Sequence, residues 1–260
     1  MSGFRSSTGF MSSVPVVTKN LIIINALFWA ATYVLRRYGI NLEDILGLHY
    51  IGSDSFNLSQ VLTYMFMHDP LNPAHVFFNM FGVYMFGRIL EQVWGPKRFL
   101  LFYMVTGIGA AIVQEITWYI DLRPFLNAVE DYASIGYSPA LSKYLNIQEG
   151  MSVPVDILVN AKDSVLNTLT TVGASGSVFG ILLGFGMLFP NAPLFLMFIP
   201  IPIKAKYMVI GYGLIELFAG VANFSTDNVA HFAHLGGMIF GYFLIRFWKN
   251  KGIGNGFFLG

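Results

Sequence analysis

The stretch TVGASGSVFGILLGFG, residues 171–186, is apolar and rich in glycine, yet it places Ser175 between Gly173 and Gly176. A run of this kind covers most of a bilayer, which a helix crosses with ~20 residues. Small residues at four-residue spacing let neighbouring helices approach closely, and a serine among them commonly has only that packing role. The rest of the chain decides whether Ser175 is also a nucleophile.

The composition is that of a membrane protein. Of the 260 residues, 55% are hydrophobic and only 11% are charged, whereas about 25% are charged in a typical soluble domain. The net charge of +1 gives no indication of nucleic-acid binding. Without cysteine the chain forms no disulfide and no cysteine-based site. No histidine spacing typical of zinc proteases occurs, so we expect neither a metal nor a cofactor.

The apolar segments predict an all-α polytopic membrane protein with six transmembrane helices. A membrane domain at 16–248 would lie between two tails, 1–15 and 249–260. The apolar run 193–203 has about ten residues, too few to span, and contains three prolines, so we expect a connection at the membrane surface. The six expected spans are 16–35, 75–94, 99–120, 174–189, 207–224 and 229–248.

The basic residues predict the orientation. With six spans, ten of the 15 Lys and Arg residues fall on the side that holds both termini, which the positive-inside rule makes cytoplasmic. The outer side then holds two long connections, 36–74 and 121–173. We expect the second to form a small surface subdomain with a helix within 154–169, where apolar residues recur at helical spacing.

Polar residues inside spans are costly and by default mark function. Ser175 and His234 both lie near the outer ends of their spans. Facing rows of glycine would bring their two helices together and place imidazole and hydroxyl at one depth, as proton transfer requires. The rows are Gly176, Gly180 and Gly184 in the fourth span and Gly237 and Gly241 in the sixth.

The second span adds two polar residues at the same outer level. His75 and Asn79 are four residues apart and so share one helix face. Beside a serine nucleophile they are candidate donors to an oxyanion, although two structural polar residues are an equally good interpretation of this pair alone.

These motifs together resemble the rhomboid family of intramembrane serine proteases, with its bacterial-type six-span core. GASG at 173–176 resembles the family's G-x-S-G around the nucleophile, and AHLGGMIFG at 233–241 resembles its A-H-x-x-G-x-x-x-G. HVFFN at 75–79 is similar to its H-x-x-x-N, and GRILEQVWGPKRF at 87–99 to its G-x-x-x-E-x-x-x-G-x-x-R.

The resemblance implies a Ser–His dyad without a third carboxylate. Ser175 would be the nucleophile and His234 the general base, while His75, Asn79 and the Ser175 N–H would hold the oxyanion. Phe179 would stack on His234, in the place of a tyrosine of many members. Glu216 lies near the middle of the fifth span, and we expect it to be too deep to reach His234. Gly173, Gly176, Gly180, Gly237 and Gly241 would pack the helices around the site.

The resemblance further implies an endopeptidase that cleaves single-span membrane proteins near the outer face of, we expect, a bacterial plasma membrane. Loop 220–228 would be a mobile cap over the site, and Ser59-Gln60 replace a Trp-Arg pair of some members. Two alternatives stay open: a catalytically inactive relative that binds membrane clients, and a small transporter or channel.

Overall fold

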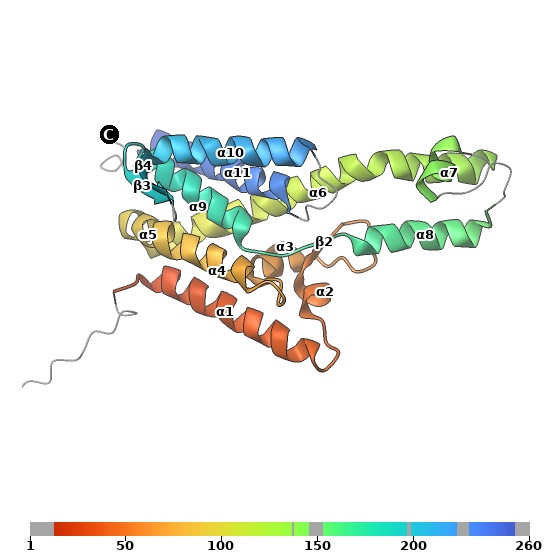
Figure 1. Cartoon of the computed structure of the whole chain (residues 1–260), viewed down its shortest axis with the longest axis horizontal. Coiled ribbons are helices and arrows are strands. Elements are labelled where there is room, and N and C mark those ends of the chain that lie inside the picture. Colours follow the sequence, from red (N-terminus) through yellow and green to blue (C-terminus); the bar gives the residue numbers. More distant parts are fainter. Residues whose placement is uncertain (1–12, 137, 146–152, 197–198, 223–228, 253–260) are drawn as a thin grey trace, which may run out of the picture.

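The helices run side by side in a computed structural model that describes residues 13–136, 138–145, 153–196, 199–222 and 229–252. The second expected span is built from three end-to-end pieces, of which the middle one, 83–87, is π-helical. The long helices are α1 (Val16–Arg36), α4 (Pro73–Gly82) continued by α5 (Arg88–Trp94), α6 (Pro96–Ile135), α9 (Ser175–Leu188), α10 (Ala205–Ala222) and α11 (His231–Asn250) (Figure 1).

The architecture is the predicted helical bundle of a polytopic membrane protein. In the described ranges, α1, α6 and α10 are long and apolar enough to cross a membrane, and α9 is a shorter apolar helix of 14 residues. The number of six spans therefore stays a prediction.

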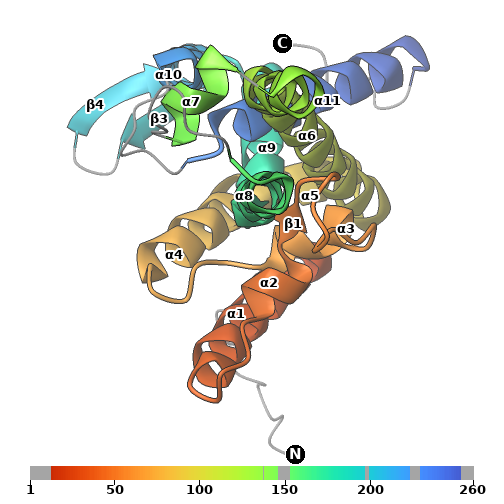
Figure 2. The same cartoon turned by 90° about the vertical axis from the view of Figure 1, so that its right-hand side faces the viewer.

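Helix α9 lies inside the bundle and packs against both α6 and α11, which also pack against each other (Figure 2). A Cβ on Gly237 would overlap the carbonyl oxygen of Gly176, and a Cβ on Gly241 would lie 3.6 Å from the Cα of Gly180. Gly176 and Gly180 thus face Gly237 and Gly241, whereas a Cβ on Gly184 would meet Leu90 and Trp94 of α5 and Phe102 of α6. The α9 glycines also face α6, where a Cβ on Gly180 would meet Thr106 at 2.6 Å. The close packing of three helices, α6, α9 and α11, therefore depends on the glycines of α9.

The start of α1 is fixed by a buried carboxylate. Glu91 of α5 accepts hydrogen bonds from the backbone N–H of Val17 (2.9 Å) and of Thr18 (2.7 Å), and from the Thr18 hydroxyl (2.7 Å). These are backbone donors that a helix start leaves without intrahelical partners. The glutamate of the 87–99 motif is therefore a helix cap that joins α1 to α5.

The first long connection is folded against the site end of α9. It contains α2 (Leu42–Leu46), α3 (Gln60–Thr63) and a 3₁₀ turn at 64–66. Its strand β1 (Leu48–His49) pairs antiparallel with β2 (Thr170–Thr171), four residues before Ser175. The buried Gln60 amide bonds to four backbone groups of this connection, so it serves as a structural centre.

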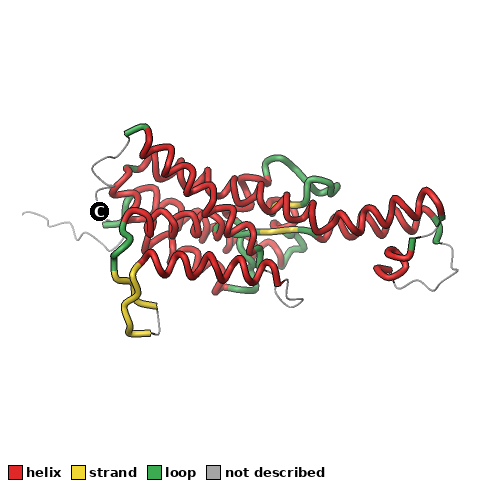
Figure 3. The backbone as a smooth tube through the Cα atoms, turned by 90° about the horizontal axis from the view of Figure 1, so that it is seen from above, coloured by secondary structure: helices red, strands yellow, loops and turns green. Residues whose placement is uncertain are grey.

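The second long connection is an extension of the bundle. Helix α6 does not end at 120 as expected but continues to Ile135, beyond the other long helices (Figure 1, Figure 3). It continues because Phe125, Val129 and Tyr132 form an apolar stripe that packs on Leu158. Leu158 belongs to α8 (Val155–Thr168), which confirms the helix predicted within 154–169, and α7 (Pro139–Leu145) covers the tip.

The apolar run 193–203 is a hairpin and not a span, as expected. Its strands β3 (Pro193–Leu196) and β4 (Ile199–Lys204) pair antiparallel between α9 and α10. The expected cap, loop 220–228, lies mostly outside the described residues. At the opposite end of the bundle from this hairpin, α4, α9 and α11 begin and α10 ends (Figure 1). The polar residues of the predicted site are brought together at that end.

Candidate active site

Ser175 and His234 are hydrogen-bonded. The Ser175 Oγ lies 2.8 Å from Nε2 of His234. Ser175 is the first residue of α9, and His234 lies in the first turn of α11, so the glycine contact between these helices sets the distance. The His234 side chain is buried, with 7% of its residue surface exposed. This is the pairing of nucleophile and base that nucleophilic catalysis requires.

An aromatic ring covers one face of the imidazole. The Phe179 and His234 rings are nearly parallel, at 9°, with centroids 4.3 Å apart. Phe179 is one turn after Ser175 on α9, so the helix that carries the hydroxyl also orients the ring that meets it.

The expectation that Glu216 is too deep to reach His234 is wrong. Its Oε2 lies 2.9 Å from Nδ1 of His234, and the third side chain of the group is therefore a carboxylate. Glu216 is six residues before the end of α10 and His234 is three after the start of α11. The two side chains reach each other because α10 and α11 pack side by side.

The sequence carried a signal for this contact. Glu216 is the one acidic residue of the apolar helix α10, and an ionisable residue within an apolar helix is a functional candidate by default. His231 precedes His234 by three residues, which places both on one helix face. The Nδ1 of His231 also lies 2.6 Å from Oε2 of Glu216.

His75 and Asn79 occupy the neighbouring helix α4. A Cβ built on Gly173 would lie 2.8 Å from Nε2 of His75 and 3.6 Å from Oγ of Ser175, so the imidazole borders the serine. Gly173 has φ +133°, a conformation that suits glycine, and its place beside His75 leaves no room for a side chain. Asn79 is buried one turn further along α4 and has no side-chain hydrogen bond to a described residue.

A second histidine supports His75 from behind. The ring of His68 is fully buried and meets the His75 ring edge to face, with centroids 4.9 Å apart. Burial, and to a smaller extent the nearby His75, lower the pKa of His68 to about 3, against a weaker opposing hydrogen bond with the Phe66 backbone. His68 is therefore neutral at physiological pH.

The acid and the two histidines of α11 also have the composition of a metal site. One ligand atom each from Glu216, His231 and His234 lie within 4.8 Å of one another, which is close enough to hold an ion. The short N···O distances to one carboxylate oxygen equally fit hydrogen bonds.

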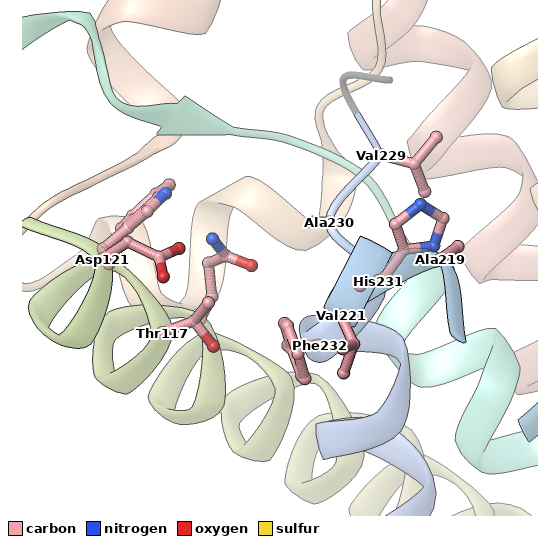
Figure 4. A pocket seen from close by; sticks show the side chains of 11 residues that line it. Thr117, Asp121, Ala219, Val221, Val229, Ala230, His231 and Phe232 are labelled. Carbon is pink, nitrogen blue, oxygen red and sulfur yellow. The ribbon is translucent and has the colours of Figure 1, made fainter. Parts of the chain in front are cut away.

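A cavity of about 320 Å³ borders His231. It lies between α6 and the adjoining ends of α10 and α11, and Figure 4 shows His231 across from Thr117 and Asp121. Its lining does not include Ser175, His75 or Asn79.

Comparison with known proteins shows the family of the chain. The model of the Rhomboid domain family matches residues 55–147 and 151–250, most of the chain. The chain belongs to the rhomboid family. Both matched segments include site residues, since the first contains His75 and Asn79 and the second Ser175, Glu216 and His234.

Two curated relatives are similar over most of this chain. One, RHOMBOID-like protein 12, mitochondrial, of Arabidopsis thaliana, is 25% identical over 85% of this chain. The other, an uncharacterized mitochondrial rhomboid protein of Schizosaccharomyces pombe, is 23% identical over 96% of this chain. The chain spans 55% of the length of the first relative and 68% of the second.

Proposed function

We propose that this rhomboid is an intramembrane serine endopeptidase that cleaves membrane-spanning segments of other proteins. The observation that carries the proposal is the 2.8 Å hydrogen bond between Ser175 Oγ and His234 Nε2 in a helical membrane bundle. In an inactive relative nothing would require these two groups to meet in this geometry.

The reaction would begin with attack of Ser175 Oγ on a substrate carbonyl carbon while its proton moves to Nε2 of His234. His75, Asn79 and the Ser175 N–H would stabilise the oxyanion. His234 would then protonate the leaving amine, and water would release the acyl group. Because a helix shields its carbonyls, the substrate segment must unwind, which favours single-span proteins with small or helix-breaking residues near the site.

Labelling of Ser175 with a fluorophosphonate tests the proposal directly. The wild-type protein in detergent should label and should cleave a single-span test protein, whereas Ser175→Ala should do neither and His234→Ala should lose cleavage. Asn79→Ala should lower the cleavage rate by about 10²–10³, as loss of one oxyanion donor does. Cleavage by Ser175→Ala would refute the serine mechanism.

The same experiment separates the alternatives. A client-binding inactive relative would bind the test protein without labelling, and a transporter or channel would do neither. The transporter is the weaker alternative. A continuous polar path would need polar residues at both ends of the bundle, and the predicted polar site residues all lie at the end opposite the hairpin.

We propose that both termini lie on the side rich in basic residues and that the site opens toward the other side. The names of both relatives favour a mitochondrial membrane over the bacterial plasma membrane that the sequence alone suggested. A fluorescent fusion imaged in the cells of origin decides between these membranes.

A further inference from the structure

A carboxylate from α10 joins two imidazoles from α11 directly behind the serine. Oε2 of Glu216 lies 2.6 Å from Nδ1 of His231 and 2.9 Å from Nδ1 of His234. Glu216 and His234 are buried, with 8% and 7% of their surfaces exposed. We propose that Glu216 is a positioning residue for His234, so that the site works as a triad; this inference rests on the proposed protease function.

The hydrogen-bond pattern fixes which nitrogen of His234 carries the proton. An ionised carboxylate only accepts hydrogen bonds, so each imidazole that faces Oε2 of Glu216 must present an N–H there. Nδ1 of His234 is therefore the protonated nitrogen of its neutral ring, and Nε2 keeps its lone pair. That lone pair faces the Ser175 hydroxyl at 2.8 Å, which makes His234 a base in the tautomer that the reaction needs.

The carboxylate also acts on the charge that the reaction creates. When Oγ of Ser175 bonds to the substrate carbon, its proton moves to Nε2, and His234 becomes a cation. A negative charge in contact with Nδ1 stabilises that cation, and more strongly at a buried position than in water. Glu216 itself gains no proton in this step.

His231 holds the carboxylate in place. Its Nδ1–H donates to the same carboxylate oxygen from one turn earlier on α11. Because two imidazoles donate to this oxygen, the carboxylate is held in a single position. His231 also borders the 320 Å³ cavity, whose other polar lining includes Thr117 and Asp121 of α6 (Figure 4). The imidazole of His231 thus stands between that cavity and Glu216.

The substitution Glu216→Gln tests the positioning role, with Glu115→Gln as its matched control. Both remove a carboxylate from an apolar helix, but Glu115 of α6 accepts from the Ile51 N–H (3.0 Å) in the first connection, not from the site. We expect Glu216→Gln to lower kcat by about 10²–10⁴ with KM within about threefold, as loss of an orienting carboxylate does. Glu115→Gln should keep kcat within about threefold.

Thermal unfolding of both variants separates chemistry from folding. If Glu216 only joins α10 to α11, Glu216→Gln lowers the melting temperature and leaves kcat of the folded fraction unchanged, which would overturn the inference. Should this variant not fold, ¹⁵N NMR of histidine-labelled wild-type protein, assigned with His234→Gln, reads the tautomer directly. Protonation of His234 at Nε2 would overturn the inference, and protonation at Nδ1 supports it.

Two further measurements distinguish failure of this inference from failure of the protease proposal and from a metal site. If Ser175→Ala still cleaves, the protease proposal fails; if Ser175→Ala is inactive but Glu216→Gln keeps its kcat, only the triad fails. EDTA should leave the fluorophosphonate labelling rate unchanged. Loss of labelling on chelation, restored by Zn²⁺, would show that the three side chains hold an ion and not a shared hydrogen bond.

Discussion

The imidazole of His234 is held on three sides: by Ser175 at Nε2, by Glu216 at Nδ1 and by the Phe179 ring on its face. Only the stacking contact is purely apolar, so it can be removed without altering a proton position. We expect Phe179→Ala to lower the labelling rate of Ser175 by about 2- to 12-fold, from an aromatic contact of about 0.5–1.5 kcal/mol. Phe179→Tyr keeps the ring and should stay within about twofold. A larger effect for Tyr than for Ala would contradict the stacking role.

His68 makes the folded protein sensitive to acid. Its pKa is about 3 in the folded state and 6.5 in the unfolded state. Below pH 6.5 only the unfolded chain takes up this proton, so stability falls as the pH falls. Between pH 7 and about pH 5 the wild-type protein should lose about 2 kcal/mol more than His68→Phe, since one pKa unit is about 1.4 kcal/mol. Unfolding in detergent at both pH values measures this; equal losses would refute it.

For single residues, the sequence predicts which side chains share a face of one helix. It does not predict contacts between two helices, which depend on how deep each residue lies in the bundle. His75 and Asn79 share a face because four residues make one turn of α4. Glu216 lies about two turns before the expected end of the fifth span, yet its side chain and that of His234 reach each other across this offset. Its solitary negative charge in an apolar helix was the better guide.

At the scale of elements, the approach of α9 and α11 determines the Ser175–His234 distance. A methyl group on Gly237 would overlap the Gly176 carbonyl, and neither backbone can yield without moving its helix. We expect Gly237→Ala to cost about 1–3 kcal/mol of stability, as overpacking does, and to lower cleavage at least about tenfold.

The matched control is Gly211→Ala in α10, where nothing lies within 4 Å of an added Cβ. It should keep its activity and be as stable as the wild-type protein or more so, because alanine favours helix by about 1 kcal/mol. Equal activity of the two variants would show that the glycine row does not set the catalytic distance.

Element boundaries were harder to predict than element types. The sequence places a helix in 99–120, but only the stripe Phe125, Val129 and Tyr132, with its partner Leu158 on α8, reveals that α6 continues to Ile135. The run 193–203 is too short to span, but its pairing as a hairpin depends on contacts that periodicity does not show.

At the scale of the whole molecule, the number of crossings depends on α9. Its 14 residues extend about 21 Å, whereas the hydrocarbon of a bilayer is about 30 Å thick. The helix is nevertheless mostly buried, with α11, α6, α10, α4 and α5 packed against it. A short helix in that position can cross where a lipid-facing one would not.

Cysteine labelling decides whether α9 crosses. The chain contains no cysteine, so Ile135→Cys on the extension of α6 and Lys251→Cys after α11 each provide one exposed thiol. Three of the expected spanning helices, α9, α10 and α11, lie between the two positions. Three crossings place the thiols on opposite sides, so in sealed, uniformly oriented vesicles an impermeant maleimide should label one variant and reach the other only after detergent. Labelling of both from the same side would show that one of these three helices does not cross.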